Sequence, residues 1–582
     1  MAEVRQGRRL EDGELQDLLS AEKARLLREA GLDAELHHYR RPALRPFTAD
    51  ERPFTTILFG NLTSKHETLI KGVFQSEGYL CEILPTPALS AFHVGKEYCN
   101  NGLCNPAYFT AGSLVETLRR LESEGLTRSE IIDRYLYITA GSCGPCRFGM
   151  YESEYQQTLQ NAGFAGFRVL TFQQTRFIKD GVNEPGLKFT MDLGLGILNA
   201  LNLGDVFYQI AYRIRPFEVH VGATDRAIEE CIGELADFLR TRKKFEIEER
   251  VPAWLYRRLE RRDGLKRFLN SLGKYREHLY DDEYKQVMRR CACRLNEVEV
   301  DRTRMRPVVK IVGEFFSQLT EGAANFNMFS FLEQEGAEVL VEPLGNLVLH
   351  WLHHPRLKLK QRREIDAAYP SARWWQVGRR MANQRAFLKK NFLWKLGDRL
   401  YCKHYRDVVE VFGGVVSDLD DQEELAYLAS PYYDPLARGG EGHLEVGKSI
   451  RYTKGRLCHM VLSLKPFGCM PSTQSDGVMA AVANRYEEML FLSIETSGEG
   501  EINAQSRVQM ALGEAKRKAR AEFEKALQTA QRELEDIRDY VLSHRELQRP
   551  LCAFPRAEGV VGTAANFILY VSKLMDRDTG RA

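Results

Sequence analysis

Short apolar runs alternate with amphipathic stretches in two parts of the chain, and this alternation is typical of βα units. In the first part, apolar runs predict strands at residues 54–60, 80–86, 135–139 and 168–172. In the second part, they predict a strand and its exit at 307–316, and further strands at 338–344, 460–466 and 490–496. Helical stretches between such strands indicate two parallel sheets.

The rest of the chain has a helical pattern. A helix is expected over residues 12–30, an apolar helix pair over 194–214, and charged helices from 220 to 295. Residues 356–410 are basic and aromatic, which is more typical of packed helices with snorkelling Arg and Lys side chains than of nucleic-acid binding. From 504 to about 547 a narrow apolar seam indicates one long helix, which either packs on its own domain or pairs with a second copy as a homodimer.

These patterns divide the chain into consecutive parts. They are an N-terminal charged arm (1–50), a first α/β domain with cysteine-bearing loops (51–185), a helical region (186–305), the start of a second α/β domain (306–355), a helical insertion (356–445), the remainder of that domain (446–502) and a long C-terminal helix with a tail (503–582). The predicted fold class is α/β, with two Rossmann-like (flavodoxin-like) parallel-sheet domains, helical insertions and a long C-terminal helix.

Composition narrows the functional classes. The 582 residues include 82 basic and 80 acidic side chains, so the formal net charge of +2 gives no case for nucleic acid or an anionic membrane as a partner. The apolar runs are too short to span a bilayer, and the N-terminus has no apolar signal region. Twelve cysteines in such a chain predict a cytoplasmic protein in which clustered thiols bind metal more often than they form disulfides.

Cys143 and Cys146, in the sequence C-G-P-C, lie between the strand at 135–139 and a predicted helix. Phe148, Tyr151 and Tyr155 follow them at helical spacing. A helix N-terminus lowers the pKa of a thiol and favours the thiolate, which is the form that binds metal or attacks disulfides. This turn is therefore the first candidate site.

Cys99 and Cys104 form a second pair on a loop that enters a helix. They flank an Asn-Asn-Gly turn, and Pro106 suits the first turn of the following helix. Loops at the carboxyl ends of parallel strands share one edge of the sheet. The two thiol pairs are therefore expected to face each other if both loops belong to one sheet.

In the second α/β region Cys469 repeats the order strand, glycine, cysteine, proline, helix. Cys458 precedes the same strand, so it should lie at the opposite end and is the weak candidate. The remaining pattern of note is C-A-C at residues 291–293, whose two side chains point about 200° apart on a helix. We interpret those two thiols and Cys231 as ordinary.

From the residues alone, four kinds of site remain open. A metal cluster could take thiolates from the separate loops. The C-G-P-C turn is also typical of a thioredoxin-type dithiol oxidoreductase. Cys99, Cys104, Cys143 and Cys146 have pair spacings that suit a structural zinc ion. Finally, the cysteines could be inert core residues of a non-catalytic interaction protein.

Five segments taken together carry a resemblance to a known family. They are KEYCNNGLCNP, GSCGPCRFGMYE, VVKIVGEFF, LKPFGCMPSTQSDG and SIETSGEGEINAQSR. The chain resembles the iron–sulfur proteins associated with 2-hydroxyacyl-CoA dehydratases and their ATP-dependent activators, within the double-cubane cluster superfamily, and among them the activase-related proteins. The resemblance covers about residues 54–545.

The resemblance implies a [4Fe-4S] cluster or a double cubane between the two α/β domains. It implies Cys104, Cys146 and Cys469 as ligands, Cys99 and Cys143 as additional ligands, and Cys458 as a sixth for a double cubane. It also implies low-potential electrons from an ATP-dependent activator of actin-like ATPase fold, passed to a substrate or partner by ketyl-radical dehydration or reduction. The sequence has no D-x-G-S-T phosphate loop, so a separate activator is expected, and it has no recognisable CoA pocket of the kind a dehydratase needs.

Overall fold

The computed structural model describes residues 12–29, 44–141, 146–173, 186–368, 376–437, 440 and 442–579. Leu44–Ala582 forms one compact unit. In the segment before it, the described residues form helix α1 (Asp12–Glu29), as the sequence predicted.

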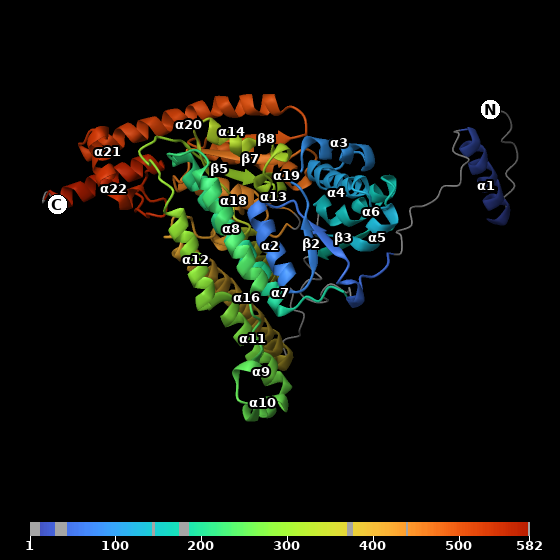
Figure 1. The fold of residues 1–582 in the computed structure, drawn as a ribbon. Coiled ribbons are helices and arrows are strands. Elements are labelled where there is room, and N and C mark those ends of the chain that lie inside the picture. The colour runs from blue at the N-terminus through green and yellow to red at the C-terminus, as the bar shows by residue number, and fades with distance from the viewer. Residues whose placement is uncertain are drawn as a thin grey trace. The chain divides into compact units, whose positions relative to one another are not determined.

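The first sheet has four parallel strands in the order β2-β1-β3-β4 (Figure 1). They are β1 (Thr56–Phe59), β2 (Leu80–Ile83), β3 (Tyr135–Gly141) and β4 (Arg168–Gln173). The central strand β1 pairs through Thr56 with Leu80 on one side and with Tyr135 on the other. Each strand lies within or beside an apolar run predicted from the sequence.

The second sheet repeats this arrangement. Its order is β6-β5-β7-β8, again with every pair parallel. The strands are β5 (Val308–Gly313), β6 (Glu338–Leu340), β7 (Met460–Pro466) and β8 (Phe491–Thr496). Two four-stranded parallel sheets with many helices confirm the predicted α/β fold class with two Rossmann-like domains.

Helices of the first half surround the first sheet and lead to the second. They are α2 (Ser64–Ser76), α3 (Leu89–Tyr98), α4 (Asn105–Ser123), α5 (Arg128–Arg134), α6 (Tyr151–Asn161), α7 (Met191–Ile214), α8 (Ala223–Thr241), α9 (Ile247–Arg250), α10 (Ala253–Glu260), α11 (Asp263–Tyr280) and α12 (Asp282–Leu295). The predicted helix pair at 194–214 was wrong, because α7 is one continuous helix. Gly204 does not break it; a Cβ there would lie 2.3 Å from the His66 ring, so this glycine lets α2 pack closely on α7.

The second half adds further helices. They are α13 (Phe315–Leu319), α14 (Met328–Gln334), α15 (Gly345–Ala368), α16 (Val377–Val411), α17 (Gln422–Ala429), α18 (Gly442–Lys454), α19 (Met470–Arg485), α20 (Glu501–Ala530), α21 (Leu534–Ser543) and α22 (Thr563–Asp578). The single helix predicted from 504 to about 547 was wrong, because α20 ends where Gln531 adopts a left-handed conformation and α21 begins after it. The seam residues Val508 and Leu512 are buried in the core of the second sheet, so this chain covers its own seam.

Helix α16 differs from the packed helix expected for residues 356–410. From Val377 to Lys390 every side chain except Phe387 is exposed. Residues near the C-terminal end of the helix, such as Tyr405 and Val408, are buried. The packing that these residues predicted is therefore found near the C-terminal end of α16, whereas its N-terminal part is exposed.

Asp205, on α7, links the two halves of the unit. Its buried carboxylate is hydrogen-bonded to His66 Nε2 of α2 at 3.1 Å and accepts the backbone N–H groups of Leu344 and Gly345 at 2.6 and 2.7 Å. These amides lie at the N-terminus of α15, which follows β6 after a short connection. One buried carboxylate thus joins a helix of the first sheet to the edge of the second.

Among the described helices, none combines the length and the apolar character needed to cross a bilayer.

Candidate metal centre

Cys99 and Cys104 lie at the two ends of a turn between helices α3 and α4. Cys99 is the C-cap of α3, and Cys104 is the N-cap of α4. The helices approach so closely that a Cβ at Gly112 would lie 1.8 Å from the carbonyl oxygen of Ala91. Because only glycine permits this contact, the packing of α3 on α4 fixes the position of the turn.

Helix α6 contacts both thiols of this turn, but at different points. The Tyr151 hydroxyl is hydrogen-bonded to Cys104 Sγ at 3.1 Å. Thr158 Oγ1 donates to Cys99 Sγ at 3.2 Å. Seven residues separate Tyr151 from Thr158, which is about 10 Å along the helix axis. The structure therefore places Cys104 near the start of α6 and Cys99 about two turns further along it.

Cys146 stands just before α6. It is the N-cap of the 3-10 helix η2 (Arg147–Met150), which leads directly into α6. The Arg147 guanidinium donates to the carbonyl oxygen of Gly102, in the turn that precedes Cys104. Cys146 therefore lies at the same end of α6 as Cys104. Cys143 is outside the residues that the structure describes.

Cys469 approaches the same place from the second sheet. It is the N-cap of α19, and Gly468 before it has a φ of +75°. The backbone N–H of Asn105 donates to the carbonyl oxygen of Phe467 at 3.0 Å. A Cβ at Gly468 would lie 3.4 Å from Cys104 Cα. The turn before Cys469 is thus in backbone contact with the turn that carries Cys104.

Cys104, Cys146 and Cys469 therefore come together although they belong to two sheets and three helix N-termini. Burial raises the pKa of Cys104. Burial, followed by the Glu314 carboxylate and more weakly by Cys146, raises the pKa of Cys469. Desolvation outweighs the helix dipole at these two caps, so without a cation both side chains stay as neutral thiols at pH 7. A bound cation would stabilise the thiolates.

Glu314 is the carboxylate that faces these thiols. It follows β5, caps α13 and accepts the Ser317 backbone N–H at 3.0 Å. Burial raises its pKa, opposed by hydrogen bonds from the amides of Phe316 and Ser317. The groups that lower this pKa are hydrogen-bond donors of Phe316 and Ser317, and none of the described groups that shift it is a cation.

Cys458 lies away from this junction. Cys458 precedes β7 and Cys469 follows it, and a seven-residue strand spans about 20 Å. Burial raises the pKa of Cys458 to about 12, and the same cause raises the pKa of Cys99 to about 12. The opposite-end placement expected for Cys458 and Cys469 is confirmed.

The described residues contain no group of three histidine, cysteine or acidic side chains close enough to hold one metal ion. The thiols of Cys104, Cys146 and Cys469 therefore do not surround a single point. A cubane distributes its irons over separate corners, so its thiolates stand further apart than those of one zinc ion. The soft thiol donors, of which Cys104 and Cys469 are buried and Cys146 is half-buried, and the close contact at Gly468 fit such a cluster.

Two residues that contribute to this junction, Glu314 and Glu154, were not predicted from the sequence. Glu314 follows a buried strand in V-V-K-I-V-G-E, and the rule that ligands gather beyond the carboxyl ends of parallel strands could have singled it out. Glu154 accepts two hydrogen bonds from Asn100, at 2.7 and 2.9 Å, and so fixes the thiol-bearing turn on α6. No sequence pattern signals that contact, because it joins side chains of separate elements.

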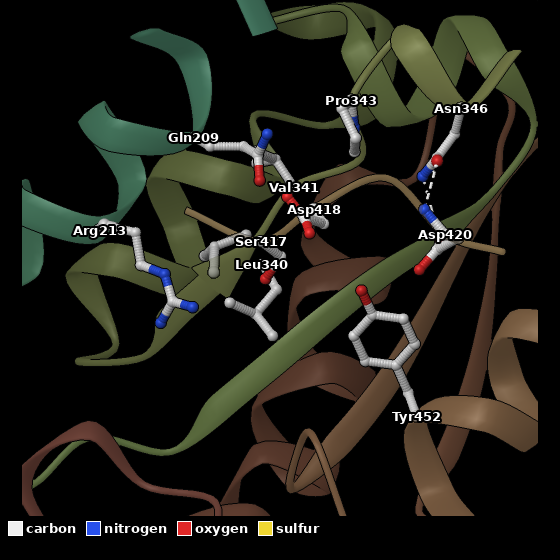
Figure 2. A pocket seen from close by; sticks show the side chains of 11 residues that line it. Gln209, Arg213, Leu340, Val341, Pro343, Asn346, Ser417, Asp418, Asp420 and Tyr452 are labelled. Carbon is white, nitrogen blue, oxygen red and sulfur yellow. Dashed lines mark hydrogen bonds between the residues drawn. The ribbon is translucent and has the colours of Figure 1, made fainter. Parts of the chain in front are cut away.

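A small cavity lies elsewhere, beside the end of β6 (Figure 2). Its volume is about 20 Å³, which is room for about one water molecule. Arg213, Asn346, Asp420 and Tyr452 are among the residues that line it. In Figure 2 Asn346 and Asp420 are hydrogen-bonded across one side, and the Asp420 backbone N–H donates to Asn346 Oδ1 at 2.8 Å. It is too small for an organic substrate, so the thiol junction remains the candidate site.

Comparisons with known proteins add no relative: no family model, curated protein or solved structure matches the chain.

Proposed function

We propose that this protein is an iron–sulfur protein whose cluster is held where the two sheets meet. Cys104 and Cys146 from the first half and Cys469 from the second are its thiolate ligands in this proposal. The observation that carries it is the hydrogen bond from Asn105 N–H to the Phe467 carbonyl oxygen at 3.0 Å. That bond brings the cysteine turns of two separate sheets into contact.

The proposed ligand set favours one cluster over two. Cys99 is bonded to Thr158, two turns along α6 from Tyr151, and Cys458 precedes β7. A double cubane that uses all six candidate thiols would need both of them at the junction. Cys143, three residues before Cys146, is the natural fourth thiol of a single [4Fe-4S] cluster.

When bound, the cluster would supply one-electron transfer at a potential set by charge, solvent exposure and hydrogen bonds to its sulfurs. The protein's own residues set those conditions. Tyr151 hydrogen-bonds Cys104 Sγ and so limits its basicity. Arg147 adds positive charge near Cys104, and Glu314 adds negative charge near both Cys104 and Cys469.

The proposal extends to the partner and the setting. The motif resemblance supports electron delivery by an ATP-dependent activator of actin-like ATPase fold, and onward transfer to a substrate or partner protein. It also supports a cytoplasmic location, where thiols stay reduced. The sequence shows no phosphate-binding loop, so the purified chain is expected not to hydrolyse ATP unless the activator is added.

Anaerobic purification with assays for iron, acid-labile sulfide and zinc tests this function. We expect iron and sulfide together with a broad charge-transfer band near ~400 nm, as thiolate-ligated iron gives. Cys469→Ser should lose most of the iron. Cys458→Ser, changed at the other end of the same strand, should keep it.

Stoichiometric zinc without sulfide would contradict the proposal and favour a structural metal site. Equal iron content in Cys469→Ser and wild type would remove the junction between the sheets as the site and leave Cys143 and Cys146 as a local pair.

A further inference from the structure

Two helical segments from different parts of the chain expose large apolar side chains among basic ones. The first is α10 with α11, and the second is Val377–Leu400 of α16; together we name them the basic arm. The most exposed apolar residues of the arm include Trp254 and Phe268 on the first segment and Phe392 on the second, which are 69%, 63% and 64% exposed. Exposed clusters of this kind mark interaction surfaces.

The two segments approach each other where their helices meet α7. Both α11 and α16 pack against α7, and Figure 1 shows them next to each other. Lys403 Nζ of α16 lies 5.2 Å from the ring centre of Tyr280, at the end of α11. Phe268 precedes Tyr280 by twelve residues, and Phe392 precedes Lys403 by eleven, which correspond to about 18 and 16 Å of helix. Each phenylalanine therefore lies at a similar distance from this contact, measured along its own helix.

Charge is concentrated on this arm. Residues 253–280 and 377–400 contain 15 lysines and arginines against four acidic residues, in a chain whose formal net charge is +2. The arm is thus strongly positive, and the rest of the chain is acidic overall. Two copies of the arm would repel each other, so the charge argues against a symmetric contact with a second copy.

The exposed apolar residues also surround much of α16. Between Val377 and Lys390 only Phe387 is classed as half-buried, and exposed residues such as Met381 (49%) and Leu388 (55%) stand among basic ones, although α16 also packs against α15. A folded protein partner covers one face of a helix. The headgroup region of a bilayer surrounds an immersed element, accepts aromatic and aliphatic side chains and lets Lys and Arg extend to phosphates.

We propose that the basic arm binds the surface of an anionic lipid bilayer. Phe268 and Phe392 enter the boundary between headgroups and acyl chains, and the surrounding lysines and arginines contact the anionic lipids. Each basic residue near such a surface adds to the attraction. This inference does not depend on the proposed metal centre.

Vesicle co-sedimentation of the full chain tests this inference. The probes are vesicles of phosphatidylcholine alone and vesicles in which one third of the lipid is phosphatidylserine. We expect binding to the anionic vesicles at least about tenfold tighter than to the neutral ones, and weakened by salt.

Two variants separate apolar insertion from charge. The double variant Phe268→Ser, Phe392→Ser should bind the anionic vesicles at least about tenfold more weakly than wild type. The matched control is Ile502→Ser, Met510→Ser, which changes two exposed apolar residues on α20 and should bind like wild type. Thermal melts of both variants should match wild type, because all four side chains are exposed.

Two results would overturn the proposal. One is equal binding to neutral and anionic vesicles, or none to either. The other is binding to anionic vesicles that is unchanged in the double phenylalanine variant, which would mean that the apolar residues of the arm do not enter the bilayer.

Discussion

The two sheets have the same strand order, yet their equivalent positions carry different side chains. After the third strand each sheet has a helix-capping cysteine, Cys146 in the first and Cys469 in the second. After the first strand, the first sheet has Asn61 and the second has Glu314. In an open parallel sheet these two positions border the point where successive crossovers diverge, and ligands bind there. The same strand order in both sheets thus places residues of each sheet at the candidate site.

The positions after the second strand differ most. In the first sheet, β2 leads to the tightly packed pair α3 and α4, whose turn carries Cys99 and Cys104. In the second sheet, β6 leads to Glu342, whose carboxylate bonds to Lys310 at 2.7 Å and to Lys448 at 2.6 Å, all three being buried. The connection after the second strand therefore carries thiols in the first sheet. In the second sheet it carries a carboxylate that belongs to a buried charge network.

The largest expected effect is on that network. Glu342→Gln removes the negative charge between two buried lysines and should lower the free energy of unfolding by about 3–5 kcal/mol. Urea unfolding at pH 7 measures it. Glu335→Gln is the control, because its ion pair with Lys516 is partly exposed and should change stability by less than about 1 kcal/mol. Similar values for the two variants would contradict a special role for the network.

The pH dependence of the free energy of unfolding should also differ between the two halves of the chain. Burial opposes ionisation of Glu342, but Lys310 and Lys448 outweigh it and hold its pKa at about 2. Its stabilisation is complete above the ordinary glutamate pKa of about 4.3 and is lost as the pH falls toward 2. In the first half, burial raises the pKa of Glu67 on α2 to about 7. That contribution has the opposite sign, being complete below about pH 4.3 and lost as the pH rises through 7.

Each of these shifts corresponds to about 3 kcal/mol across its range. Urea unfolding of wild type, Glu67→Gln and Glu342→Gln from pH 3 to pH 8 checks both. The Glu67 variant should remove the loss of stability toward pH 8, and the Glu342 variant should reduce the loss toward pH 3. An unchanged slope in either variant would assign that pH dependence to other groups.

The smallest expected effect concerns the contact between the sheets. Gly468→Ala strains a residue with a φ of +75° and places a Cβ 3.1 Å from the Leu103 carbonyl oxygen. Gly78→Ala imposes the same backbone strain, with a φ of +79°, but its Cβ meets open space. Each should lose about 1–2 kcal/mol from backbone strain. Thermal melts measure both variants, and any additional loss of stability in Gly468→Ala over Gly78→Ala is due to the contact between the sheets. Equal losses would mean that the turn at Leu103 moves aside without cost.

Much of the fold could be predicted because local signals agree with it. Apolar runs located each strand that the structure describes, and the βα alternation predicted parallel pairing. Helix α3 was missed, since Pro85 and Pro87 precede it and Ala88 offers no capping side chain. The break after Ala530 was missed because a seam of spacing three and four continues through it.

The site was harder to predict for a different reason. The sequence indicated six candidate cysteines, and the family resemblance implied Cys104, Cys146 and Cys469 as the main ligands. That these three lie near one another depends on contacts such as Asn105 with Phe467, which no local pattern encodes. The formal net charge of +2 is the sum of a basic arm and an acidic remainder. The prediction of no membrane partner rested on that total, and only the placement of the helices shows where the positive charge gathers.

The order of the three thiols along the chain has a consequence in time. Cys469 follows Cys146 by 323 residues. At a synthesis rate of about 5–20 residues per second, roughly 15–65 s pass on the ribosome between the two. During that interval a nascent chain presents Cys104 and Cys146 without their third partner. A metal centre that requires all three must therefore be inserted after most of the chain has been made, and its delivery has to be timed to a nearly finished protein.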